Sequence, residues 1–254
     1  MLQDKILDKS VPIPLYYQLK TIILKEIDSG EYPLGGMIPM ENELIDIFQV
    51  SRTTVRQAIS ELVQEGRLYR IKSKGTFVSK PKIKYEFKDR MYSFNAPSSE
   101  EIIRSGRTPS TEVLGLEIIP ASDLLADIFN IVPKSEIVRL FRRRCADDQP
   151  IVRVKTYMPY SKCGFMMECD FTQEGLYDTL STREETRIHR MSQVCEAIAA
   201  GPEDVEMLLV KRGSPIHYFR TIGYNSKDEP TEYSEAFYRG DQNQFHIEIV
   251  LDPK

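Results

Sequence analysis

The sequence lacks any apolar run approaching the about 18 residues that a membrane helix needs, which excludes a helical membrane anchor. Its first residues, MLQDKILDKSVPIP, are too charged for a signal peptide, so we predict a cytoplasmic protein with no membrane partner. The four cysteines, at positions 145, 163, 169 and 195, contain no C-x-x-C pair, and none of the three histidines has metal-ligand spacing from them. We therefore predict reduced thiols, no metal site and no cofactor.

Signatures of catalysis are also missing. The chain has no nucleophile elbow, phosphate-binding glycine loop or metal-ligand cluster, so we predict that it is not an enzyme and has no catalytic residues. What it does have is 254 residues, 41% hydrophobic and 28% charged, which suits a folded chain of more than one domain.

The charge is unevenly distributed. The net charge of −4 combines −4 in residues 1–50, +7 in residues 51–90 and −7 in residues 91–254. A local basic patch attracts phosphates whatever the total charge, while acidic flanks limit non-specific binding. Residues 51–90 are therefore the candidate nucleic-acid region.

The first part of the chain predicts a winged helix-turn-helix over residues 1–80. Apolar stripes predict helices at about 13–29, 41–48 and 52–65, the last with Ser51 as its N-cap. The segments 68–71 and 76–79 can pair as a hairpin wing. Such a fold places the N-terminal residues of its third helix in the major groove.

Polar and basic residues occupy the outer side of this third helix and the wing. Arg52 and Arg56 lie one turn apart and can grip guanine or phosphate. A solvated helix face explains each one singly, but the cap, stripe and basic wing together favour DNA binding. The candidate DNA-binding residues are Arg52, Thr53, Thr54, Arg56, Gln57, Lys72, Ser73, Lys74 and Gly75.

Residues 81–90 are charge-rich and lack a helical stripe, so we predict a linker there, followed by a second domain over 91–254. We expect strands at 111–119, 136–145, 151–158, 187–198, 215–225, 231–239 and 245–251, and helices at 98–104, 122–129, 174–181 and 202–210. Turn-rich segments at 146–150 and 226–230 join strands directly. This pattern favours an antiparallel sheet and an α+β fold.

Two arginines in this domain suggest a ligand site. On an extended strand, Arg142 and Arg144 share one face with Val138 and Leu140. Two guanidiniums beside an apolar surface repel one another unless an anion lies between them. The residues alone leave two alternatives: a phosphate or carboxylate site, or an exposed basic strand end near a turn.

The motifs also resemble a known family. PLYYQL at 14–19, IPME at 38–41, VSRTTVRQA at 50–58 and GTFV at 75–78 are similar to the DNA-binding domain of GntR-family transcription regulators. RSGRTPST at 104–111, Asp148-Gln149-Pro150, Leu176-Tyr177 and residues 232–241 resemble the UTRA effector domain of the HutC-type subfamily. The resemblance implies a chorismate-lyase-like fold and an effector pocket with these residues: Ser93, Arg142, Arg144, Gly175, Tyr177, Arg190, Glu232 and Tyr238.

Four positions depart from the family pattern. Asn42 stands where an arginine is common, and Ser73 replaces a frequent glycine at the wing tip. Gly175 and Val154 replace a serine and a glutamate that are common in members sensing amino-sugar phosphates. We therefore expect an anionic effector, but the sequence does not indicate a particular sugar.

These features predict a one-component transcription regulator, a repressor that binds double-stranded operator DNA as a homodimer. A small anionic effector such as a phosphosugar would bias a two-state equilibrium in domain orientation. The alternatives are an activator, a sensor of a carboxylate metabolite, and, more remotely, a chorismate-lyase-like enzyme.

Overall fold

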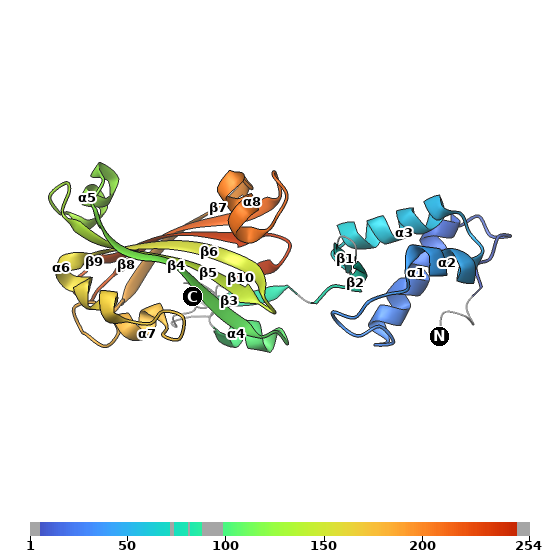
Figure 1. The fold of residues 1–254 in the computed structure, drawn as a ribbon, viewed down its shortest axis with the longest axis horizontal. Coiled ribbons are helices and arrows are strands. Elements are labelled where there is room, and N and C mark those ends of the chain that lie inside the picture. The colour runs from blue at the N-terminus through green and yellow to red at the C-terminus, as the bar shows by residue number, and fades with distance from the viewer. Residues whose placement is uncertain (1–5, 72–73, 81, 88–98, 248–254) are drawn as a thin grey trace, which may run out of the picture. The chain divides into compact units, whose positions relative to one another are not determined.

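The computed structural model describes residues 6–71, 74–80, 82–87 and 99–247 (Figure 1). The chain divides into two compact units, residues 1–81 and 82–254. No helix in the described ranges is long and apolar enough to cross a membrane.

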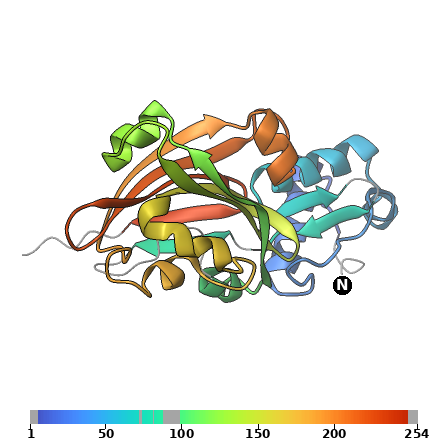
Figure 2. The ribbon, with the colours of Figure 1, turned by 60° about the vertical axis from the view of Figure 1, so that its left-hand side comes forward.

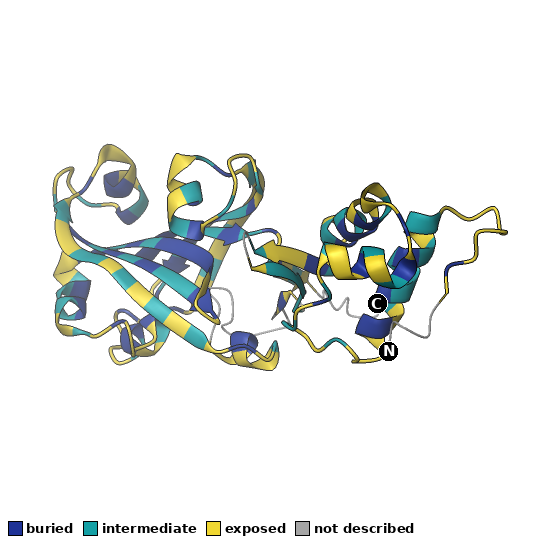
Figure 3. Ribbon diagram, turned by 45° about the vertical axis from the view of Figure 1, so that its right-hand side comes forward, coloured by how far each residue is buried: buried dark blue, intermediate teal, exposed yellow. Residues whose placement is uncertain are grey.

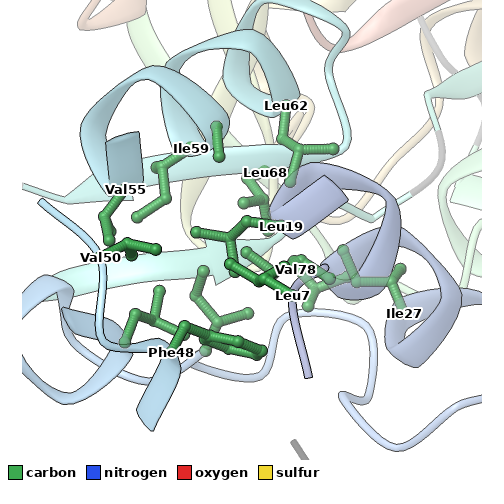
Figure 4. Packing of buried hydrophobic residues seen from close by; sticks show 14 residues of the cluster. Leu7, Leu19, Ile27, Phe48, Val50, Val55, Ile59, Leu62, Leu68 and Val78 are labelled. Carbon is green, nitrogen blue, oxygen red and sulfur yellow. The ribbon is translucent and has the colours of Figure 1, made fainter. Parts of the chain in front are cut away.

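The N-terminal unit has the elements expected of a winged helix-turn-helix. It contains α1 (Leu15–Asp28), α2 (Glu41–Phe48), α3 (Arg52–Gln64) and a hairpin of β1 (Leu68–Ile71) with β2 (Gly75–Val78). One apolar side of each helix is buried in a shared core that also contains hairpin residues, as Leu19, Leu62 and Val78 show in Figure 4. The sequence stripes therefore predicted this core correctly.

Local capping fixes where α3 begins. The Ser51 hydroxyl accepts a hydrogen bond from the Thr54 backbone N–H at 3.2 Å, as predicted for an N-cap. Gln49 ends α2 in the left-handed conformation, with φ 49°, which turns the chain sharply from α2 into α3. The two helices thus follow each other through a very short connection.

The C-terminal unit is built on a six-stranded antiparallel sheet with the order β4-β5-β6-β9-β8-β7 (Figure 1). The strands are β4 (Pro109–Pro120), β5 (Glu136–Ala146), β6 (Gln149–Pro159), β7 (Arg190–Ala199), β8 (Pro215–Tyr224) and β9 (Pro230–Arg239). The predicted hairpin turns join β5 to β6 and β8 to β9. Their residues Asp147, Asp148 and Asp228 adopt positive φ angles of 51°, 60° and 59°.

Helices cover both faces of this sheet (Figure 2). One face carries α5 (Asp123–Phe129) and α8 (Pro202–Leu208), and the other carries α6 (Tyr160–Cys163), the 3-10 helix η2 (Gly164–Glu168) and α7 (Leu176–Leu180). A further helix, α4 (Ser99–Arg104), contacts β4. Figure 3 shows that the long strands contain many buried residues. The sequence did not predict α6 or η2.

The predicted linker needs correction. Residues 83–87 form strand β3 (Ile83–Phe87), which pairs in parallel with β10 (Asn243–Ile247) in a separate two-stranded sheet. The Tyr85 hydroxyl donates to Asn243 Oδ1 at 2.9 Å and anchors β3 within the C-terminal unit. Residues 81 and 88–90 lie outside the described residues. The prediction failed because parallel pairing of distant segments leaves no local turn signal.

Candidate DNA-binding surface and ligand pocket

The outer side of α3 has the residues that the sequence predicted for DNA contact. Arg52, Thr53, Arg56 and Gln57 are exposed, while Val55 and Ala58 point into the core. Thr54 is half-buried, and its hydroxyl lies 2.9 Å from the Ser51 hydroxyl. Thr54 therefore supports the cap as well as lying on the candidate surface.

The wing is only partly described. Lys74 is exposed and Gly75, with φ 135°, begins β2. A Cβ at Gly75 would lie 2.9 Å from the Met37 sulfur, so this position favours glycine both by conformation and by space. The predicted contacts Lys72 and Ser73 lie outside the described residues.

The start of α2 gathers three arginines of this surface. Arg52 Nη2 donates to Asn42 Oδ1 at 3.0 Å. Glu41 lies 3.5 Å from Arg56 Nε and 3.3 Å from Arg70 Nη2. The sequence did not single out Arg70, although its place on β1 beside α3 makes it a further candidate contact.

A pocket lies on the α7 side of the large sheet. Strand register explains its walls, because Arg142, Val154, Ala236 and Phe219 form one continuous row across β5, β6, β9 and β8. The full lining is Arg142, Val154, Thr156, Leu176, Tyr177, Phe219, Thr221, Glu232, Ser234 and Ala236.

Arg142 is the principal cation of this pocket. Its side chain is almost fully buried, at 5% exposure, and its Nε has no hydrogen-bond partner among the described residues. Burial, and then the nearby Arg144, lower its pKa to about 10, so it stays charged at neutral pH. The guanidinium lies 5.9 Å from the Phe171 ring, a weak partner for a buried charge. Such a group is stable when an anion reaches it.

Glu232 is the principal acid of the pocket. It is completely buried, and neither carboxylate oxygen makes a well-formed hydrogen bond to a described residue. Burial raises its pKa to about 7, although Ser234, Tyr177 and Arg142 each lower it. Among the described residues it makes no hydrogen-bonded ion pair with Arg142, although Arg142 is near enough to lower its pKa. Glu232 is thus poised to accept hydrogen bonds or a positive charge from a ligand.

Hydroxyl groups complete the polar lining. Thr156 is fully buried without a hydrogen-bond partner among described residues, and the Tyr177 hydroxyl lies near Glu232 without making a well-formed hydrogen bond. Burial, and then Glu232, raise the pKa of Tyr177 well above its usual range, so it remains a donor. Unsatisfied buried polar groups from separate elements facing one pocket are the mark of a ligand site.

Three of the predicted pocket residues, Arg144, Tyr238 and Arg190, are not part of this lining. Arg144 donates to the Ser99 hydroxyl at 3.1 Å, and Tyr238 packs its ring against Tyr85 and Phe245. Arg190 is paired with Asp228 at 2.8 Å and stacked on Tyr224, away from the pocket lining.

The other two predicted pocket residues are Gly175 and Ser93. Gly175 is the N-cap of α7 and is not part of the lining. A Cβ at Gly175 would lie 2.3 Å from Asp178 Oδ2, so any larger residue would require the Asp178 side chain to move. Ser93 lies outside the described residues.

Sequence reasoning missed two walls of the pocket, Phe219 and Thr221 on β8. They face it because β8 pairs with β9 so that Phe219 lies opposite Ala236 and Thr221 opposite Ser234. Alternation from Glu232 already placed Ser234 and Ala236 on this face. The register of β8 was the missing information.

Comparison with known proteins identifies the chain. The pattern of the GntR family of bacterial regulatory proteins matches residues 15–78, and that of the UTRA domain matches residues 104–244. The chain belongs to the GntR family, HutC type. It is a DNA-binding transcription regulator, and its domains and relatives are not those of enzymes.

Individual relatives extend over nearly the whole chain. The transcriptional repressor NagR of Bacillus subtilis is 33% identical over 94% of this chain and 96% of its own length. A probable fructoselysine utilization operon repressor of Escherichia coli is 28% identical over 94% and 95%. The crystal structure of PhnF from Mycobacterium smegmatis has a TM-score of 0.64 at 21% identity, covering 92% of this chain and 99% of PhnF, and supports the fold.

Proposed function

We propose that this GntR/UTRA regulator is a repressor in the cytoplasm that binds operator DNA as a homodimer and is released by a small anionic effector. The observation that carries the effector proposal is Arg142, a buried guanidinium without a hydrogen-bonding partner among the described residues, facing a pocket. A two-fold dimer places two recognition helices on a pseudo-palindromic site. Two relatives described as repressors, NagR and the fructoselysine regulator, support the sign of regulation.

The pocket chemistry favours a phosphorylated sugar or sugar derivative. Arg142 supplies a bidentate donor for a phosphate or carboxylate. Glu232, Thr156 and Tyr177 supply acceptors and donors for hydroxyl groups, or for an amine in the case of Glu232. Val154 leaves an apolar patch beside Arg142, in register with it. The relative described as a repressor of a fructoselysine utilization operon supports a sugar-derived effector.

A packed route leads from the pocket toward β3. Phe219 lines the pocket and touches Phe245 at 4.7 Å between ring centroids. Phe245 stacks on Tyr85 of β3 at 4.9 Å. We propose that a ligand repacking Phe219 shifts this aromatic cluster and with it β3, the first described strand of the C-terminal unit.

Operator titration tests the effector proposal. Operators selected from random duplexes are labelled, and binding is followed by anisotropy with sugar phosphates, the matching free sugars, sugar carboxylates and inorganic phosphate. A phosphorylated sugar is expected to lower operator affinity about 5- to 150-fold, and its free sugar to have no effect. A response to carboxylates alone would identify a carboxylate sensor. The absence of any anionic response would contradict the proposal.

The contacts of α3 are tested by substitution. Arg52→Ala and Arg56→Ala are each expected to weaken operator binding by about 1–3 kcal/mol. Both side chains lie outside the core, so circular dichroism and melting temperature should stay unchanged. Lys25→Ala, an exposed basic residue near the end of α1, is the matched control. Unchanged operator affinity in both arginine variants would show that α3 is not the reading helix.

A further inference from the structure

We infer that Asn42 is a positioning residue for DNA recognition, which holds the Arg52 guanidinium in the orientation that reads the operator. The inference rests on the proposed DNA contact of Arg52 and assigns a role to the residue that departs from the family's usual arginine. Asn42 is the second residue of α2, and Arg52 is the first residue of α3. The sharp turn at Gln49 brings these two helix starts together.

The contact between them is specific. Arg52 Nη2 donates to Asn42 Oδ1 at 3.0 Å, and both side chains are exposed. Within the described residues, neither side chain has another hydrogen-bond or ion-pair partner. The bond joins side chains ten positions apart, so it requires the packing of α2 against α3.

The chemistry of the partner matters. An exposed arginine samples many rotamers, and fixing one before binding lowers the entropic cost of a bidentate contact. Asn42 is neutral and uses one N–H group of Arg52, which leaves the positive charge and the other N–H groups for DNA. A carboxylate at this place would compete with phosphate. A neutral acceptor therefore orients the Arg52 side chain without neutralising its positive charge.

The neighbouring residue provides a contrast on the same turn. Glu41 is charged and lies between Arg56, at 3.5 Å, and Arg70, at 3.3 Å. It brings those two cations together, whereas the neutral Asn42 accepts a hydrogen bond from Arg52. The start of α2 thus serves as a platform for the basic side chains of α3 and β1.

The competing role for Asn42 is a direct DNA contact through its amide N–H₂. A double-mutant cycle separates the two roles, using full-length Asn42→Ala, Arg52→Ala and the double variant on a selected operator. Positioning predicts that Asn42→Ala weakens operator binding about 3- to 10-fold in the wild-type background. It predicts little further loss in the Arg52→Ala background, because the residue that Asn42 orients is gone.

Two additional readouts sharpen the test. Asn42→Ala should leave the salt dependence of binding unchanged, because no charged phosphate contact is lost, but should reduce discrimination at the base pair that Arg52 reads. Asn42→Asp retains the acceptor and should preserve that discrimination while lowering overall affinity. Thr21→Ala, a neutral, half-buried position on α1, is the control.

The outcomes are distinct. Equal losses from Asn42→Ala with and without Arg52 would overturn positioning and assign Asn42 a direct contact. No loss from Asn42→Ala alone would overturn it as well. If Arg52→Ala itself leaves operator binding unchanged, the proposed DNA contact of Arg52 fails, and the positioning role falls with it.

Discussion

Arg142→Met is expected to abolish effector binding while leaving operator binding without effector unchanged. Removal of the buried guanidinium should lower the affinity for an anionic effector by about 100-fold or more, which corresponds to about 3 kcal/mol or more of binding free energy. Methionine has a similar length and no charge. Because Arg142 has no hydrogen-bonding partner in the described protein, its loss removes a desolvation cost. The free energy of unfolding should stay constant or rise by about 1–2 kcal/mol.

Calorimetric titration of the effector and chemical denaturation of the full chain measure the two quantities. Arg220→Met is the matched control, because Arg220 is an exposed arginine paired with Glu196 outside the pocket. This control should bind effector normally. A destabilisation of Arg142→Met by about 3–5 kcal/mol would instead indicate a broken internal ion pair, contrary to the structure.

The sequence predicted the helices of the N-terminal unit well because their signals are local. The stripe through Val55, Ile59 and Leu62 fixes the buried side of α3, and Ser51 fixes its start. The exposure of Arg52 and Arg56 then follows from helical periodicity. No local pattern, however, indicates that Asn42 meets Arg52, because that contact depends on how α2 packs on α3.

Strand alternation placed Arg142 correctly on a face with Val138 and Leu140, all of them buried. It could not decide between pocket and exposed strand end, since that depends on α7 covering the face and on β9 lying two strands away in the same sheet. The pairing of β3 with β10, whose residues Tyr85 and Asn243 are 158 positions apart, is invisible to periodicity for the same reason. Arg190 was placed by resemblance alone, and the local pair with Asp228 instead accounts for its orientation.

The second large effect is expected in the pH dependence of stability, through Glu232. Burial raises the pKa of this carboxyl to about 7, from an ordinary value of 4.5. Between these values the unfolded chain has lost the proton and the folded protein retains it. Folded protein therefore binds more protons, and the free energy of unfolding falls as pH rises through this window. The stabilising contribution is complete below pH about 4.5 and lost above about 7, a change of about 3 kcal/mol.

Glu232→Gln isolates this contribution because glutamine mimics the protonated acid. Below pH about 4.5 the variant and the wild type should have similar stability, and the variant should become more stable by about 3 kcal/mol as pH rises to about 7. Denaturant titrations of both proteins across pH 4–8 measure the difference, in which other titrating groups cancel. In an Arg142→Met background the midpoint should move upward, because Arg142 lowers the pKa of Glu232. A variant that is less stable than the wild type near pH 7, by an amount that shrinks toward low pH, would mean that Glu232 is ionised and paired in the folded protein. The effector would then meet a neutralised pair rather than a separate cation and acid.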